Sequence, residues 1–105
     1  MPNTQNPLHQ MQEIVTLYFY YLDYLNAHDA LEVSSVNNSK EEASVYVAKV
    51  FRSFITLNDE DKEILNKEYF ARVRSGWWMS KYQKTNFDLL LVNAVNKFLR
   101  RFYSI

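Results

Sequence analysis

Apolar residues recur at helical spacing over most of the chain, and polar stretches divide this pattern into segments. Between His9 and Leu31, apolar side chains return every three or four residues, which predicts one long amphipathic helix. Four consecutive aromatic residues, Tyr18–Tyr21, would each favour a strand, but the length and the 3.6-residue period of the segment favour a helix. Residues 1–8 are expected to form a disordered polar tail.

A polar loop over Val33–Ser39 separates this helix from a second amphipathic segment. Ser39 and Glu42 stand three residues apart, the spacing of a capping box, and predict a helix that begins there and ends near Ile55. The side chains expected on its buried face are Ala43, Val47, Val50, Phe51 and Phe54.

The third segment opens with Asn58, which is followed by three acidic residues. An asparagine side chain can cap a helix, and carboxylates are stabilised at the positive end of the helix dipole. We therefore expect a helix from Asn58 to Phe70 that buries Ile64, Leu65 and Phe70, with Tyr69 beside them. The carboxylates at its start are explained by this position and do not indicate a catalytic cluster.

The last segment begins after a connector that contains Gly76, where a turn is expected. Trp77–Lys81 is long enough for one further helical turn. Its tryptophans are expected to anchor the core, and stacking on nucleic-acid bases is their alternative role. Thr85 predicts the cap of a final helix that runs to about Tyr103. These segments predict an all-α fold, a single-domain bundle of four to five helices over residues 9–105.

Composition supports this fold class and excludes several functions. The chain has 105 residues with one Gly and two Pro, too few chain-breaking residues for an all-β fold rich in turns. It has no Cys, so disulfides and thiolate metal sites are excluded. The longest apolar run, near Ile14–Leu25, is about half a membrane-spanning length. The polar start lacks the features of a signal peptide, so we expect a cytoplasmic protein without a membrane partner.

The net charge of zero conceals an uneven distribution along the chain. Residues 1–61 carry three basic and nine acidic side chains, 3 − 9 = −6, and residues 62–105 carry nine basic and three acidic ones, 9 − 3 = +6. Such asymmetry indicates a polyanionic partner, head-to-tail association of two copies, or attraction between the two halves within one fold.

The C-terminal half resembles a known family. Leu57, Asp61–Leu65, the pair Tyr69-Phe70, Trp77-Trp78 and Lys84–Phe87 follow an order similar to the phage ArpU-type regulators and to a group of small mycoplasma proteins. Both groups are similar to sigma-factor region 4. The resemblance covers about residues 57–103 and implies a trihelical helix-turn-helix-like unit. It also implies a transcription-associated, non-enzymatic protein whose partner is DNA or the transcription machinery.

In such a unit the start of the last helix enters the DNA major groove. The matching positions here are Lys84, Asn86, Asp88, Leu89 and Asn93. With the basic side chains nearby, the nucleic-acid-binding candidates are Arg72, Arg74, Lys81, Lys84, Asn86, Asn93, Lys97, Arg100 and Arg101. For Lys97, Arg100 and Arg101, favourable interaction with the end of a helix dipole is an alternative role.

The same helix also supports a different interpretation, because Asp88 and four apolar residues stand where a DNA-reading helix is polar. At about 100° per residue, Phe87, Leu91, Ala94, Phe98 and Phe102 form one apolar face with Leu90. A second set, spaced three and four apart as in paired helices, consists of Leu89, Val92, Asn96, Leu99 and Tyr103. This set is expected to pack either against the first helix or against a second copy, as a homodimer or protein-interaction module.

The sequence lacks the signatures of the commoner enzyme and cofactor sites. It has no Gly-rich phosphate loop and no nucleophile elbow. His9 and Glu13, like His28 and Glu32, stand four residues apart, but neither pair has a third ligand nearby, and surface pairing explains them. We therefore expect no enzyme activity, no metal, no cofactor and no small-molecule substrate.

Overall fold

The computed structural model describes residues 6–31, 37–71 and 73–104, and every regular element in these ranges is a helix. The predicted all-α fold class is confirmed. The elements are α1 (Pro7–Leu31), α2 (Asn37–Ile55), α3 (Asp59–Leu65), a π-helical turn η1 (Asn66–Phe70), a 3-10 turn η2 (Trp77–Ser80) and α4 (Lys84–Ser104).

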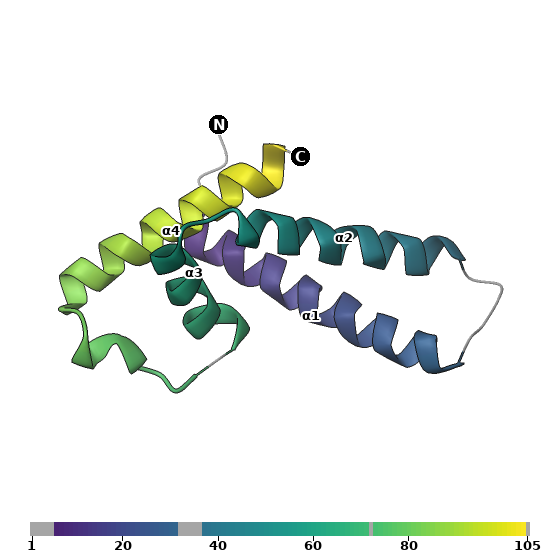
Figure 1. Cartoon of the computed structure of the whole chain (residues 1–105), viewed down its shortest axis with the longest axis horizontal. Helices are drawn as coiled ribbons and strands as arrows, with labels where there is room; N and C mark the ends of the chain where they lie inside the picture. The colour runs from purple at the N-terminus through teal and green to yellow at the C-terminus, as the bar shows by residue number, and fades with distance from the viewer. Residues whose placement is uncertain (1–5, 32–36, 72, 105) are drawn as a thin grey trace.

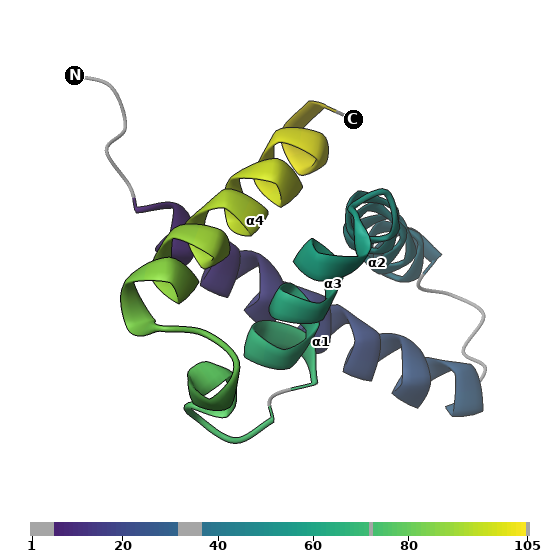
Figure 2. The same ribbon diagram turned by 60° about the vertical axis from the view of Figure 1, so that its left-hand side comes forward.

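Helices α1 and α2 run antiparallel as a long hairpin, and α4 crosses the N-terminal half of α1 (Figure 1). The short α3 packs against α4, and the turn η1 that continues it contacts α1 of the hairpin (Figure 2). The far half of the hairpin extends beyond the other helices, so the molecule measures 51 × 37 × 23 Å. Its radius of gyration is 15.8 Å, larger than the roughly 13 Å of a compact domain of this length.

The core lies where the four α-helices meet, and α4 contributes the largest share of it. Two neighbouring rows of side chains, each spaced by four residues, face inward from α4. The first row is Phe87, Leu91, Val95 and Leu99, and the second is Ala94, Phe98 and Phe102. The same cluster contains Met11, Ile14 and Val15 of α1, Val50 of α2, Ile64 and Leu65 of α3, and also Leu57 and Tyr69. The predicted apolar face of the last helix is therefore present, and Val95 and Leu99 widen it.

Asparagine side chains cap the starts of α1 and α3, whereas α2 begins two residues before its predicted cap. The Asn6 side chain accepts a hydrogen bond from the Leu8 amide at 2.7 Å, so α1 begins two residues before the predicted His9. Asn58 caps α3 as predicted, accepting from the Asp61 amide at 2.8 Å. Ser39 lies inside α2, because that helix begins at Asn37.

The last two elements follow the predicted order with small shifts. Gly76 adopts the left-handed conformation with φ 79°, which a residue without Cβ accommodates, and the 3-10 turn η2 follows it. Helix α4 begins at Lys84, so Thr85 lies in its first turn instead of preceding it.

The predicted burial of Phe51 is wrong, since this ring is 57% exposed. Among the described side chains of α2, the buried ones are Ala43, Val50 and Ser53, and Phe51 is displaced from Val50 by about 100° around the helix. Ser53 fits the interior because its hydroxyl donates to the Lys49 carbonyl at 2.8 Å. The buried face of α2 therefore includes the polar Ser53, whereas the pattern of apolar residues predicted Phe51 on that face.

The tryptophans are half-buried and cover Phe87 at the edge of the core. The Trp78 ring stacks on Phe87 with centroids 4.8 Å apart and an interplanar angle of 8°, and Trp77 meets Phe87 edge-on at 5.5 Å. The indole N–H of Trp77 donates to Glu68 at 3.0 Å. Both rings therefore pack against Phe87, and residues 73–75 of the connector are exposed to solvent.

Candidate nucleic-acid interface

One exposed row of side chains runs along the whole length of α4, opposite the core. Its members are spaced three and four residues apart and are called the α4 stripe: Asn86, Leu89, Asn93, Asn96, Arg100 and Tyr103. At 3.6 residues per turn, this spacing keeps them on one side of the helix. The stripe combines residues predicted as nucleic-acid contacts with residues predicted as a protein interface.

The C-terminal half of the stripe borders a shallow groove formed with the start of α1. The groove has a volume of about 640 Å³ and is lined by Pro7 and Gln10 of α1 and by α4 residues from Asn93 to Ser104. Asparagine and glutamine amides and the Arg100 guanidinium supply hydrogen-bond donors and acceptors there. Gln10 was not predicted as a site residue, because only the tertiary crossing of α1 and α4 places it beside the stripe.

Three of the basic candidates form ion pairs within the chain. Lys97 lies 3.0 Å from Asp61 of α3, and Lys84 lies 2.9 Å from Asp88 one turn later in α4. Lys81 lies 3.1 Å from Glu63. Of these three contacts, only the Lys97–Asp61 pair joins the acidic and basic halves of the chain, and it is one attraction between them within the fold. The other two pairs lie within residues 62–105 and leave the net charge of that half unchanged.

The Glu63 carboxylate joins two lysines and ties the connector to α3. It accepts hydrogen bonds from Lys67 at 2.9 Å and from Lys81 at 3.1 Å. The hydrogen bond from Lys67, and to a smaller extent that from Lys81, holds the pKa of Glu63 below its ordinary value. The hydrogen bond to Glu63 in turn raises the pKa of Lys81. Lys67 also lies over the Trp77 ring, 5.1 Å from its centroid. The cluster is thus a structural link between segments.

The remaining basic candidates are arginines. Arg74, Arg100 and Arg101 are exposed and form no ion pair with any residue that the structure describes. Arg72 lies outside the described residues. Arg100 stands on the α4 stripe and Arg101 follows it, so the end of α4 carries two guanidinium groups available to an external anion.

The predicted interface residues fall into two environments. Leu89 and Tyr103 are 62% and 63% exposed, and Asn96 is exposed between them. Val92 is half-buried, whereas Leu99 is 7% exposed and belongs to the chain's own core. For Leu99, the predicted alternative of packing within the chain is the one observed.

Other chemistry finds little support in the described part of the chain. No group of three His, Asp or Glu side chains there is arranged to hold a metal ion. His9 and Glu13 form an exposed pair at 3.3 Å, and the side chains of His28 and Glu32 lie outside the described ones. None of the described helices is long and apolar enough to cross a membrane.

Comparison with models of protein families, with curated proteins and with solved structures finds no match. The resemblance to sigma-factor region 4 therefore remains a hypothesis drawn from the residues themselves.

Proposed function

We propose that this chain is a small, non-enzymatic, transcription-associated protein that binds duplex DNA through the α4 stripe. The observation that carries the proposal is the alignment of Asn86, Asn93, Asn96 and Arg100 on one exposed face of a long helix. Asparagine amides pair with adenine edges and arginine with guanine edges in the major groove, which admits a helix of this kind.

The order of elements supports this reading. A short helix, the 3-10 turn η2 and a long terminal helix follow one another, with three residues between Ser80 and Lys84. The segment between η1 and α4, residues 71–83, is longer than the three- or four-residue turn of a standard helix-turn-helix unit, so the support lies in the order of the elements and not in the length of the connection. The N-terminal positions of α4, including Lys84 and Asn86, are exposed as DNA contact requires.

Electrostatics predicts weak binding with a modest dependence on salt. With Lys81, Lys84 and Lys97 paired to carboxylates, few cations are left for phosphates. About three phosphate contacts correspond to a slope near −2.7 in a plot of log K against log salt. Affinity for random duplex DNA should therefore fall by roughly 40-fold between 50 and 200 mM salt.

The test is a fluorescence-anisotropy titration of labelled duplex at both salt concentrations. Arg100→Glu should weaken binding, whereas Arg52→Glu, the same charge change at an exposed position of α2, should not. Asn93→Ala should reduce discrimination between duplexes more than it reduces affinity for random sequence. Absence of binding at the lower salt concentration, or equal effects of the two arginine variants, would contradict the proposal.

A second function is favoured by the apolar members of the same stripe. Leu89 and Tyr103 are exposed at 62% and 63%, and burying such side chains in a homodimer would be favourable. In sedimentation experiments, Leu89→Lys should then convert a dimer to a monomer. Met79→Lys is the matched control, because Met79 is 68% exposed away from the stripe. A wild-type monomer at high concentration would argue against this alternative.

A further inference from the structure

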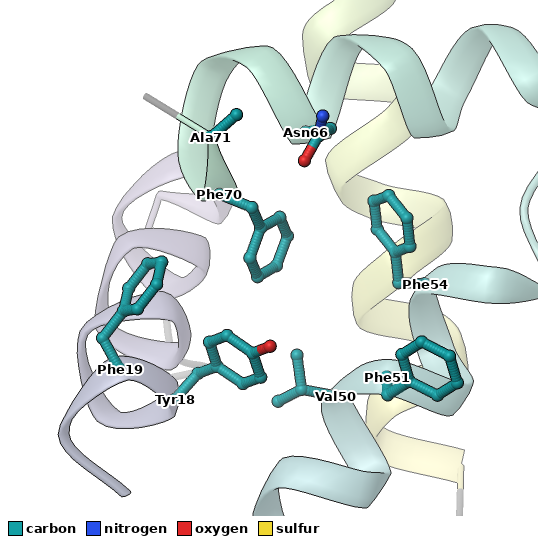
Figure 3. A pocket seen from close by; sticks show the side chains of 8 residues that line it. All are labelled: Tyr18, Phe19, Val50, Phe51, Phe54, Asn66, Phe70 and Ala71. Carbon is teal, nitrogen blue, oxygen red and sulfur yellow. The ribbon is translucent and has the colours of Figure 1, made fainter. Parts of the chain in front are cut away.

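A pocket lined mainly by aromatic rings opens between α1, α2 and η1, on a different part of the molecule from the α4 stripe. Its volume is about 240 Å³. Figure 3 shows Tyr18 and Phe19 on one side, Phe51 and Phe54 on the other, and Phe70 between them. No lining residue carries a charge, so the pocket suits a neutral ligand.

The inner wall of this pocket is fixed by ring-on-ring packing. Phe70 meets Tyr18 edge-on with centroids 5.5 Å apart and an angle of 89°, and it meets Phe54 at 5.5 Å and 74°. Such edge-to-face pairs are favourable beyond their buried area. These contacts fix the rings relative to one another, so a ligand would need to order little of the site.

The π-helical turn η1 supplies the remaining wall. The Ala71 amide donates to the Asn66 carbonyl at 2.6 Å, five residues back along the chain. This wide turn brings Asn66 and Ala71 to the same side of the helix, where both line the pocket. Single π-turns within helices occur frequently at functional sites. Here the irregular turn places an amide beside the rings.

Two polar groups face this apolar space. Figure 3 shows the side-chain amide of Asn66 and the hydroxyl of Tyr18 directed toward the space between the rings. The Asn66 amide makes no hydrogen bond to any residue that the structure describes. An apolar cavity with one or two convergent polar groups is the usual form of a small-molecule site.

We propose that this pocket binds a neutral, planar two-ring aromatic molecule of the indole class, with its N–H donating to the Asn66 side-chain oxygen. Size is compatible with this ligand class: an enclosed apolar cavity of about 150 Å³ accommodates benzene, and this pocket, which is open on one side, has about 240 Å³. The rings of Phe54 and Phe70 supply edges and faces for stacking, and Phe51 lies at the open side, 57% exposed.

The experiment is calorimetric titration of the full chain with indole and with 1-methylindole, which has the same rings but no N–H. Both should bind saturably. Asn66→Ala should weaken indole binding roughly three- to tenfold, the effect of one lost hydrogen bond, and leave 1-methylindole binding unchanged. Asn93→Ala, an exposed asparagine of the α4 stripe, should change neither.

Two further variants test the position of the site. Ala71 is exposed at the pocket edge, so Ala71→Trp should fill the opening and abolish binding of both probes. Phe51→Ala should weaken both, whereas Tyr103→Ala, which removes a similarly exposed ring elsewhere, should weaken neither. Circular dichroism of each variant establishes that the helices are retained.

Several outcomes would overturn the assignment. Absence of saturable heat with either probe would exclude a ligand site of this class. An equal response of indole and 1-methylindole to Asn66→Ala would remove the amide from the recognition. Binding that survives both Ala71→Trp and Phe51→Ala would place the probes elsewhere. A dimer that Phe51→Ala dissociates would assign the pocket to a second copy of the chain.

Discussion

The Lys97 ammonium of α4 lies 3.0 Å from a carboxylate oxygen of Asp61 in α3, and Asp61 is only 4% exposed. This pair joins residues from the basic and acidic halves of the chain across two helices. A buried carboxylate requires a partner, because its transfer out of water is otherwise costly. Lys97 is thus a structural residue as well as a candidate for nucleic-acid contact.

Lys97→Met should destabilise the fold by about 2–3 kcal/mol, since it leaves the Asp61 carboxylate buried without its cation. Lys84→Met is the matched control. Its pair with Asp88 is exposed, at 74% and 54% for the two side chains, so the loss should stay below about 1 kcal/mol. Urea unfolding of both variants measures the difference. Equal losses would mean that burial of Asp61 does not govern the interaction.

The sequence predicted features that depend on local signals and missed those that depend on helix crossings. The long first helix, the Asn58 cap and the turn at Gly76 each follow from neighbouring residues, and each was correctly predicted. The burial of Asp61 and the exposure of Phe51 depend on how α3 and α2 pack against the rest of the fold. Periodicity within one helix contains no information about those contacts.

The candidate site shows the same limit. All six members of the α4 stripe can be grouped by their spacing, but which side of α4 faces solvent is decided by α1 and α3. Leu99 shows the consequence: it fits the spacing of the second apolar set, yet it continues the buried row that contains Val95.

Asn58→Ala should destabilise the protein by about 1 kcal/mol, because the Asp61 amide loses its side-chain acceptor. Asn58→Asp should be tolerated, since aspartate is an equally good cap. Thermal unfolding followed by circular dichroism measures both variants. The prediction fails if alanine and aspartate have the same effect on the midpoint, because only one of them can accept the hydrogen bond.

The raised pKa of Tyr46 should make the folded protein lose stability at alkaline pH. Burial of the phenol is the main cause that raises its pKa from 10.0 to about 12, and the nearby phenols of Tyr103 and Tyr21 add smaller electrostatic contributions. Because the folded state favours the neutral phenol, the stabilisation is complete below the unfolded pKa near 10 and is lost as pH rises toward 12. Tyr46→Phe should therefore be less sensitive than wild type to pH in this window.

Urea midpoints measured below pH 10 and between pH 10 and 12 provide the comparison. Tyr20→Phe is the control, since Tyr20 is 63% exposed. Tyr69 also has its pKa raised to about 12 by burial, so a residual alkaline loss should persist in Tyr46→Phe. If Tyr46→Phe and Tyr20→Phe lose stability in parallel with wild type, ionisation of Tyr46 is not coupled to unfolding.

Leu89 and Leu99 lie ten residues apart on α4, and the same substitution should destabilise the fold at Leu99 but hardly at Leu89. Leu99 is 7% exposed within the row that contains Leu91 and Val95, so Leu99→Ala removes buried contacts and should cost about 2–4 kcal/mol. Leu89 is 62% exposed, and Leu89→Ala should change the stability of the monomer by less than about 0.5 kcal/mol. Both variants shorten the same side chain in the same helix, which removes helix propensity as an explanation.

The measurement also separates the two functions proposed for the α4 stripe. Unfolding at increasing protein concentration should leave the Leu89→Ala effect unchanged if the stripe serves DNA alone. If the stripe pairs with a second copy, the wild type becomes more stable with concentration and Leu89→Ala loses that gain, because association stabilises the folded state by mass action. A large, concentration-independent cost of Leu89→Ala would contradict both, since it would require Leu89 to be buried within its own chain.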